Sequence, residues 1–313
     1  MAQPTNTFDT YDSVGEREDL SDVIYSISPT DTPFISSAAK TKATAVLHEW
    51  QTDALAAAAT NNAVIEGDEA TLDAVSATTR LSNSSQIMDK TVVITGTQES
   101  VDKAGRASEL AYQIAKKAKE LKRDMEATIT GNQAEVAGNS TTARKFGSLG
   151  AWIETNDDLG ASGSSGGAGN TARTDGTQRA FTESQLKAVI KKCWDEGGDP
   201  SMIMLGSFNK QVLSGFTGGS TRFDPAENKR LVAAVDVYES DFGAMTVVPN
   251  RFQRARDVFV LQPDMFATAF LRDFSLMDLA KTGDATKQAL LAEYTLVSKN
   301  EKASGAIFDV TTS

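Results

Sequence analysis

Apolar and polar residues alternate in two stretches of the chain that are separated by a long, mostly polar excursion. In VLHEWQTDAL (residues 46–55) and in QIMDKTVVITGTQ (residues 86–98), neighbouring side chains differ in character, as they do on the two faces of a β-strand. The excursion between them holds too few large apolar side chains for a core of its own. We therefore expect residues 46–98 to form an extended two-stranded loop, which is marginal alone and is typically completed by another chain.

A helical period follows directly. From residue 99 to residue 131, large apolar side chains recur every three or four positions and no proline interrupts them. The apolar positions are Leu110, Ile114, Ala118, Leu121, Met125 and Ile129. With Ser100 as N-cap and Gly131 as stop, the pattern predicts one helix of roughly 45 Å.

The polar face of this predicted helix carries the strongest basic cluster of the chain. Its members are Lys116, Lys117, Lys119, Lys122 and Arg123. Acidic residues at positions 120, 124 and 126 are near enough on the helix to balance them, which would make this an ordinary solvated face. The alternative is an electrostatic contact with an acidic neighbouring subunit.

Residues 1–45 have the pattern of an arm rather than of a domain. Acidic residues outnumber basic ones, and apolar side chains occur only in short groups. Ser21 can cap a short helix whose apolar face includes Ile24 and Ile27, and two prolines then force extended chain. A segment of this kind is suited to lie against another molecule.

The second half of the chain begins with a glycine- and serine-rich segment, residues 156–180, which we expect to be a flexible surface loop. Residues 181–270 then change to a compact mixture of helices and strands, opened by a predicted capping box of Thr182 and Gln185. The helix that follows has one apolar face, formed by Leu186, Val189, Ile190, Cys193 and Trp194. The later elements are the strand MIMLG, the helix SFNKQVLSGF, a hairpin around DFG, and the strands VFVLQP, ATAFLR, ALLAEYTLVS and AIFDV.

Composition narrows the class of protein. The 313 residues carry a net charge of −11, which leaves no basic surface for a large nucleic-acid contact. No apolar run approaches the roughly 18 residues of a membrane helix, and the polar, acidic start of the chain does not resemble a secretory signal. The single cysteine excludes an internal disulfide and fits a reducing cytoplasm.

The residues able to carry chemistry do not converge on a catalytic motif. On a strand, His48 and Glu49 point to opposite faces, so this base and this carboxylate cannot meet, and we expect His48 to be structural or an interface residue. Cys193 is expected to be a buried apolar side chain. With one histidine and one cysteine, the usual zinc sites cannot be built, and no Gly-x-Ser-x-Gly motif is present.

Carboxylates remain the one open source of chemistry. Glu66, Asp68 and Glu69 cluster in IEGDEA, where a divalent cation could bind, and an exposed acidic loop tip is the alternative. The paired carboxylates of a hydrolase cannot be recognised from spacing along a chain. We therefore expect no enzyme activity and no cofactor, with a carboxylate-based hydrolase kept as an alternative.

The order of these parts resembles the Hong Kong 97-type fold of tailed-bacteriophage major capsid proteins, an α+β fold. Several stretches are similar to one family of phage major head proteins with that fold. They are REDLSDVIYSISPTDTPF, KTKATAVLHEWQTDAL, AVIEGDEA, DKTVVITGTQESVDKAGRASELAYQ and KELKRDME. The resemblance covers the whole order of elements and is densest over residues 7–155.

The resemblance implies a division of the chain and a set of partners. Residues 1–45 would be the N-terminal arm, 46–98 the extended loop, 99–180 the peripheral domain with its spine helix and glycine-rich loop, 181–270 the axial domain, and 271–313 the return to the peripheral domain. Copies of the chain would form the hexamers and pentamers of an icosahedral virion capsid around double-stranded DNA, assembled in the host cytoplasm. A portal and a separate scaffolding or decoration protein would be further partners. Packaged DNA would be contacted only indirectly, and no membrane is involved.

Residues expected at subunit contacts come from the arm, the extended loop and the basic helix. They are Ile24, Ile27, Phe34, Trp50, Arg80, Lys116, Lys117 and Arg123. The alternatives to a phage head are an encapsulin-like bacterial compartment of the same fold, which would come with a cargo enzyme, and a surface-layer protein or adhesin, which would be exported.

Overall fold

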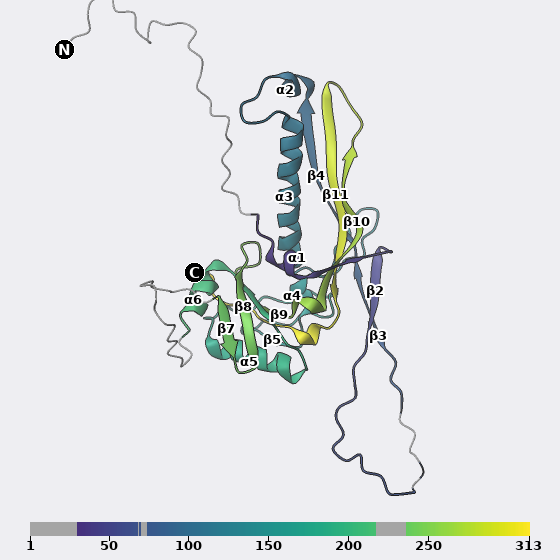
Figure 1. Ribbon diagram of the computed structural model, residues 1–313, viewed down its shortest axis with the longest axis vertical. Helices are drawn as coiled ribbons and strands as arrows, with labels where there is room; N and C mark the ends of the chain where they lie inside the picture. The colour runs from purple at the N-terminus through teal and green to yellow at the C-terminus, as the bar shows by residue number, and fades with distance from the viewer. Residues whose placement is uncertain (1–29, 68, 70–73, 217–235) are drawn as a thin grey trace, which may run out of the picture.

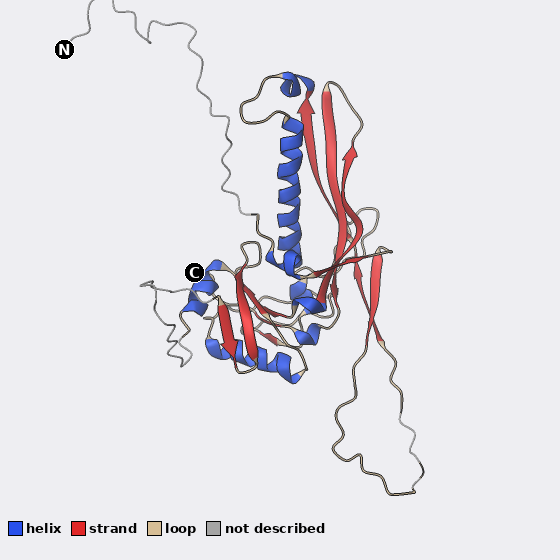
Figure 2. Cartoon of the chain, in the orientation of Figure 1, coloured by secondary structure: helices blue, strands red, loops and turns tan. Residues whose placement is uncertain are grey.

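The computed structural model describes residues 30–67, 69, 74–216 and 236–313. These residues form an elongated half, in which one long helix lies along a sheet, and a compact half built on a second sheet (Figure 1). A two-stranded ribbon starts near the junction of the two halves and carries a long loop away from the body (Figure 2).

The elongated half is built on a four-stranded sheet with the order β1-β10-β11-β4. Its strands are β1 (Ala39–Lys42), β4 (Gln86–Thr95), β10 (Phe266–Asp278) and β11 (Ala285–Ser298). Strand β1 runs parallel to β10, whereas β11 is antiparallel to both β10 and β4. Helix α3 (Glu109–Ile129) lies alongside this sheet (Figure 1), so segments far apart in the sequence build one layer.

Alternation along β4 decides which of its side chains face α3. A small apolar cluster joins helix and sheet, and it includes Met88, Leu121, Leu290 and Ala292. Next to it, Lys90 of β4 pairs with Asp124 of α3 at 2.5 Å. The side chains of Ile87 and Val93 point to the other face and are about half exposed. The strand therefore has one covered and one open face, which is what its pattern predicts.

The two-stranded ribbon consists of β2 (Leu47–Thr52) and β3 (Thr79–Ser84). The prediction that residues 86–98 form the return strand of the excursion is wrong, because residues 86–95 form β4 and pair with β11. The chain changes sheets at Ser85, which is fully buried and donates from Oγ to Glu293 at 2.9 Å. An alternating pattern is the same for any strand with one covered face, so it could not distinguish the two partners.

The long helix is shorter than its pattern predicts. It begins at Glu109, and its 21 residues span about 31 Å. Ser108 is the N-cap, with Oγ accepting from the amide of Ala111 at 3.2 Å, so the prediction of Ser100 in this role is wrong. Ser100 instead ends a separate short helix, α2 (Gly96–Ser100). Between the two helices the chain turns through Gly105 at a φ of +74°, a conformation that few other residues adopt.

The compact half is built on a six-stranded sheet with the order β5-β12-β9-β6-β8-β7. Its strands are β5 (Asp157–Asp158), β6 (Met202–Leu205), β7 (Val237–Ser240), β8 (Gly243–Pro249), β9 (Val258–Leu261) and β12 (Gly305–Ile307). The remaining helices are α1 (Pro33–Ser37), α4 (Leu149–Trp152), α5 (Glu183–Asp195) and α6 (Ser207–Ser214), with 3-10 turns η1 (Pro263–Met265) and η2 (Glu301–Ala303).

The central strands β6 and β9 are buried on both faces and lie between two apolar cores. Ile203 and Val260 face a core shared with α5 and α6. Met204 and Phe259 face a larger core that also contains Trp152 and reaches into the elongated half. Continuous apolar runs such as MIML and VFVL are typical of strands covered on both sides, and the second core joins the two halves into one folded body.

Helix α5 confirms most of its prediction. The side chain of Thr182 and that of Gln185 form the capping box, and Leu186, Val189, Ile190 and Cys193 are buried. Trp194 is the exception, because its side chain is 56% exposed and packs beside the ring of Phe242, with ring centroids 5.3 Å apart. It lies at the edge of the apolar stripe, where a helix rotates side chains out of the core.

The glycine-rich residues 156–180 do not form the loosely held surface loop that their composition predicts. The side chain of Arg173 is fully buried there and pairs with Asp257 and with Asp309, the latter at 3.1 Å. Gly169 has a φ of +80° and lies so close to a tryptophan ring that a Cβ would be 2.6 Å from it. The glycines therefore permit close packing rather than flexibility.

The last strand of the chain also differs from its prediction. Residues 271–313 were expected to return to the long-helix part, but β12 pairs with β9 and β5 in the compact half. In the opposite sense, β10 already belongs to the sheet of the elongated half from Phe266 onward. The chain thus crosses between the halves twice near its end. The sequence pattern does not show which of the two sheets each of these strands joins.

Candidate assembly surfaces

The loop between β2 and β3 exposes large apolar side chains. Leu55 and Val75 are 99% and 97% exposed, and Val64 and Ile65 are also largely exposed. The loop extends away from the body of the subunit (Figure 2), and its described residues between 53 and 78 are all exposed. Since each exposed apolar side chain loses the free energy that burial would give, this loop has the character of a surface that another molecule covers.

The root of this loop is held by Trp50 of β2. Its indole Nε1 donates to the carbonyl of Ser298 at 2.8 Å, and its ring lies 5.5 Å from that of Trp152. Trp50 is therefore engaged with its own subunit and only partly buried, and its role as a subunit contact stays a prediction. The ribbon is anchored at its root, while its far end stays open.

His48 and Glu49 point to opposite faces of β2, as predicted. The His48 ring lies 6.0 Å from that of Trp50, and partial burial lowers its pKa, so the imidazole stays neutral near pH 7. On the exposed face, Glu49 pairs with Arg80 of β3. This pair links the two strands across the ribbon, and it leaves most of the Arg80 side chain open to solvent.

The predicted contacts of the arm divide between two parts of the chain. Ile24 and Ile27 lie outside the described residues. Phe34 in α1 is fully buried, and its ring packs edge-on against Phe266, with centroids 5.9 Å apart. The prediction of Phe34 as a subunit contact is therefore wrong, because no surface of its side chain is left for another chain.

The basic cluster of α3 is only partly neutralised within the subunit. Lys117 pairs with Glu120 at 2.7 Å, and the guanidinium of Arg123 lies over the ring of Phe252, 5.5 Å from its centroid. Lys116, Lys119 and Lys122 are exposed, and none of them forms a salt bridge with the residues that the structure describes. These three lysines, which we call the lysine stripe, follow one another at three-residue intervals on the exposed side of the helix.

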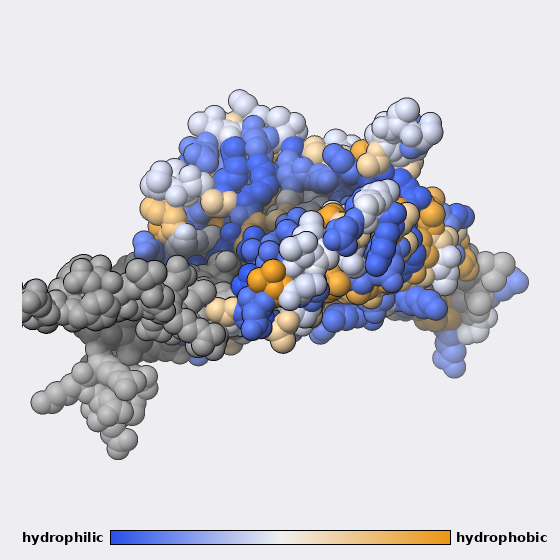
Figure 3. Space-filling model, turned by 90° about the horizontal axis from the view of Figure 1, so that it is seen from above, coloured by the Kyte–Doolittle hydropathy of each residue, from blue (hydrophilic) through white to orange (hydrophobic). Residues whose placement is uncertain are grey.

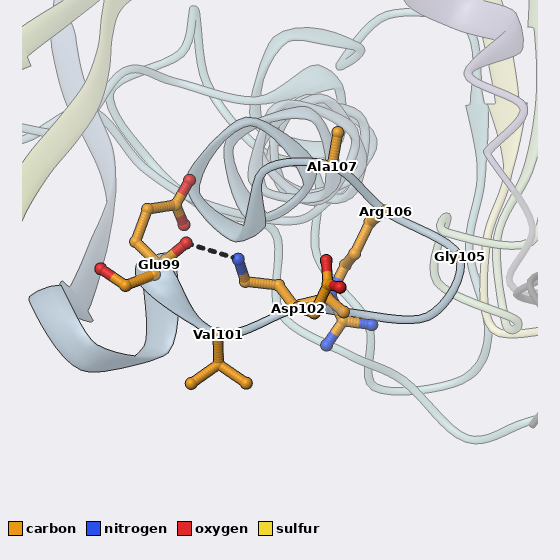
Figure 4. A pocket seen from close by; sticks show the side chains of 8 residues that line it. Glu99, Val101, Asp102, Gly105, Arg106 and Ala107 are labelled. Atoms are coloured by element: carbon orange, nitrogen blue, oxygen red, sulfur yellow. Dashed lines mark hydrogen bonds between the residues drawn. The ribbon is translucent and has the colours of Figure 1, made fainter. Parts of the chain in front are cut away.

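The loop between α2 and α3 encloses an open, polar hollow of about 580 Å³ at the end of the elongated half. Lys103 donates to the carbonyl of Glu99 at 2.7 Å, and Glu99, Val101 and Arg106 are among the residues that line the hollow (Figure 4). The Glu99 carboxylate also accepts from the amide of Glu109, and hydrogen bonds, chiefly from Ser108, lower its pKa. Charged walls and wide exposure suit contact with a polar protein surface more than retention of a small apolar ligand.

Cys193 and the acidic cluster at residues 66–69 are candidates for chemistry in the sequence. Burial raises the pKa of Cys193 to about 12, so this thiol is protonated and shielded, as predicted. Of the predicted acidic cluster, Asp68 lies outside the described residues, and the described ones contain no group of three or more His, Cys, Asp or Glu able to hold a metal ion. No helix in the described part of the chain is long and apolar enough to cross a membrane. Seen from above, the surface is largely hydrophilic with scattered apolar residues (Figure 3).

Comparison with known proteins shows which protein family this chain belongs to. The model of a family described as SU10 major capsid protein matches residues 3–311, nearly the whole sequence. The chain belongs to the SU10 family of major capsid proteins. A relative, the major capsid protein of Escherichia phage Phieco32, is 28% identical over 345 residues, which covers 98% of each protein.

Solved phage capsids share the fold of this SU10-family protein. The capsid asymmetric unit of cyanophage A-1(L) matches with a TM-score of 0.67 at 13% identity, over 97% of this chain and 99% of that one. A chain of Gordonia phage Cozz gives 0.62 at 11% identity, over 95% and 92%. A structure of phage G major capsid and decoration proteins gives 0.55 at 11% identity, over 99% and 100%. These structures confirm the Hong Kong 97-like fold. The family match confirms the role as a structural component of a phage capsid, which implies self-association.

Proposed function

We propose that this major capsid protein forms hexamers and pentamers that close into an icosahedral head around double-stranded DNA. The observation that carries the proposal is the loop of residues 53–78, which is anchored at Trp50 and exposes large apolar side chains at Leu55 and Val75. Laid on a neighbouring subunit, the loop makes a contact between two different surfaces. Contacts of that kind close into rings, and many weak ones per subunit give a stable shell.

The lysine stripe is a second surface for assembly. Its partner in this proposal is an acidic surface of a neighbouring subunit, as the chain's net charge of −11 makes acidic surface abundant. Lys117 and Arg123 add positive charge to the same helix, α3, and Arg80 adds positive charge to strand β3. Because exposed charges are screened by salt, this contact steers subunits together and sets their register more than it holds them.

The parts of the chain take their roles from the fold. In this proposal the residues up to 45 act as an arm, the elongated half is the peripheral domain with α3 as its spine, and the compact half is the axial domain near the symmetry axis of a capsomer. The role is structural rather than catalytic. A protein that packs DNA behind a shell benefits from a net negative charge, because the DNA must be released again.

Further partners follow from the same role. A portal and a separate scaffolding or decoration protein are proposed, and the phage G structure joins major capsid proteins with decoration proteins. Assembly is proposed to take place in the host cytoplasm, with packaged DNA contacted only indirectly. Neither a cargo-loaded compartment nor a carboxylate-based hydrolase finds support in the comparisons.

The proposal is tested by making the apolar side chains of the loop polar. A variant with Leu55, Val64, Ile65 and Val75 changed to Ser keeps the melting temperature of the subunit, because these side chains are exposed in it. By sedimentation and negative-stain electron microscopy it forms no rings of five or six and no shells. A control variant with Ala56, Ala59, Asn62 and Ala63 changed to Ser assembles like the unmodified protein. Shells of normal yield from the first variant would contradict the role of the loop.

A further inference from the structure

Glu126 is a buried carboxylate in the last turn of the spine helix α3. Its side chain is fully buried, and within the described part of the chain no Lys, Arg or His forms a salt bridge with it. Burial raises its pKa, although three hydrogen bonds act against that rise. A buried acid without a cation needs another reason to be tolerated.

The three donors come from two other parts of the subunit. Oε1 accepts from the backbone amide of Phe34 at 2.8 Å and from Nδ2 of Asn250 at 2.7 Å, and Oε2 accepts from the amide of Ile35 at 3.0 Å. Phe34 and Ile35 are in the first turn of α1, whose own N-cap residue, Thr32, makes no side-chain cap bond. Glu126 therefore supplies, from a different helix, the cap that α1 lacks.

The helix dipoles give the charge of Glu126 opposite effects on the stability of α3 and of α1. A negative charge near the C-terminal end of α3 is unfavourable for that helix, because the exposed carbonyls there already carry partial negative charge. The same charge is favourable at the N-terminal end of α1. The carboxylate thus weakens its own helix and stabilises the first turn of another one, which marks it as an attachment point for α1.

Three parts of the subunit meet at this carboxylate. Helix α1 is the described root of the arm, α3 is the spine, and Asn250 directly follows β8 of the compact half. An open hollow of about 440 Å³ lies beside the junction, between the arm root at Thr30 to Pro33 and the end of β8 at Pro249. The arm root therefore borders open space at Thr30 to Pro33 and is bonded to Glu126 at Phe34 and Ile35.

We propose that Glu126 is the positioning residue that sets the direction in which the arm leaves the subunit, and that Asn250 couples this direction to the placement of the compact half. The functional part of this inference rests on the proposed role of the arm in assembly. The anchoring itself does not, since it concerns hydrogen bonds within one subunit.

Hydrogen exchange measured by mass spectrometry on the full-length protein tests the anchoring. Glu126→Gln replaces one of the two acceptor oxygens by an NH2 donor that faces the α1 amides, so amide exchange in residues 34–37 becomes about tenfold faster. Asn250→Ala leaves both amides in place but frees one carboxylate oxygen from its side-chain donor. A severalfold faster exchange in α1 follows if Asn250 couples the two parts, whereas a purely local role would loosen only the segment around Asn250.

Asn209→Ala is the matched control, because Asn209 is also buried in the compact half and, among the described residues, donates to the carbonyls of Ala255 and Thr311. In the Asn209→Ala variant, the rate of hydrogen exchange in α1 stays as in the unmodified protein. Unchanged α1 exchange in both Glu126→Gln and Asn250→Ala would overturn the inference, and if Glu126→Gln does not fold, Asn250→Ala alone decides. Electron microscopy of the same samples separates the anchoring from its effect on assembly. Faster α1 exchange with normal shells upholds the anchoring and shows that assembly does not depend on the direction set by Glu126.

Discussion

Trp50 is a large apolar side chain that could contribute either to the fold of one subunit or to a contact between subunits. Its indole ring fills space next to Trp152, and its Nε1 donates to the backbone of β11 at Ser298. Since these contacts lie within one subunit, Trp50 contributes to the stability of the monomer and fixes the base of the loop. A large side chain on an alternating strand fits a subunit interface equally well. The sequence therefore does not show that Trp50 contacts Trp152 and Ser298, and only the fold does.

Trp50→Ala is expected to lower the free energy of unfolding by about 2 kcal/mol, through lost apolar packing and the lost hydrogen bond. Trp194→Ala is the matched control, because the Trp194 side chain is more than half exposed, and it is expected to change stability by no more than about 0.5 kcal/mol. Urea unfolding followed by circular dichroism measures both. Equal effects of the two substitutions would show that the Trp50 ring is not part of the subunit core.

Cys193 gives a prediction on pH. Burial raises the pKa of its thiol from 9.0 to about 12, so the folded protein keeps the thiol protonated where an unfolded chain would begin to ionise. The stability that depends on this thiol is fully present below pH 9 and is lost as the pH rises from about 9 towards 12. Iodoacetamide at pH 8.5 is therefore expected to label the native protein far more slowly than the urea-unfolded one, and comparable rates would place the thiol at the surface.

At the scale of elements, the sequence predicts what local interactions decide. The capping box and apolar spacing of α5 lie within its own residues, and the helix forms where they indicate. The start of α3 could not be predicted in this way, because Glu99 accepts from the amides of Glu109 and Leu110 and closes a loop where the apolar period alone would continue the helix. The same holds for Ser85, whose burial between two sheets depends on β11.

The glycine-rich segment shows a second limit of sequence reasoning. Composition alone indicates flexibility, yet Arg173 is buried against carboxylates that lie 84 and 136 residues away, at Asp257 and Asp309. Of the predicted contact residues, Phe34 proved internal for the same reason, since its partner Phe266 is distant in sequence. Lys116 could be predicted as an exposed charge, because a polar helix face needs no distant partner to stay in water.

The arm provides a prediction at this scale, and the structure sharpens where it should be cut. Removal of residues 1–29 is expected to leave the melting temperature of the subunit nearly unchanged and to prevent shell formation. Removal of residues 1–40 also takes away Phe34, which is fully buried, and is expected to lower stability by about 3 kcal/mol or more. Calorimetry with electron microscopy distinguishes the two, and normal shells from the shorter truncation would show that residues 1–29 are dispensable for assembly.

At the scale of the whole molecule, one subunit combines a well-packed body with segments that its body does not cover. The core around Trp152 and Phe259 joins the two halves, so the body folds as a unit. The described residues of the loop 53–78 lie outside that core, and side chains such as Leu55 and Val64 are exposed there. A protein of this build gains the missing burial only in an assembly, which agrees with its place in a capsid family.

The most direct test is a cryo-electron microscopy structure of assembled heads, refined far enough to trace residues 53–78. The account predicts that this loop lies on the body of a neighbouring subunit, with Leu55, Val64, Ile65 and Val75 buried there, in both hexamers and pentamers. A loop that folds back on its own subunit, or that stays in solvent in the finished head, would contradict it.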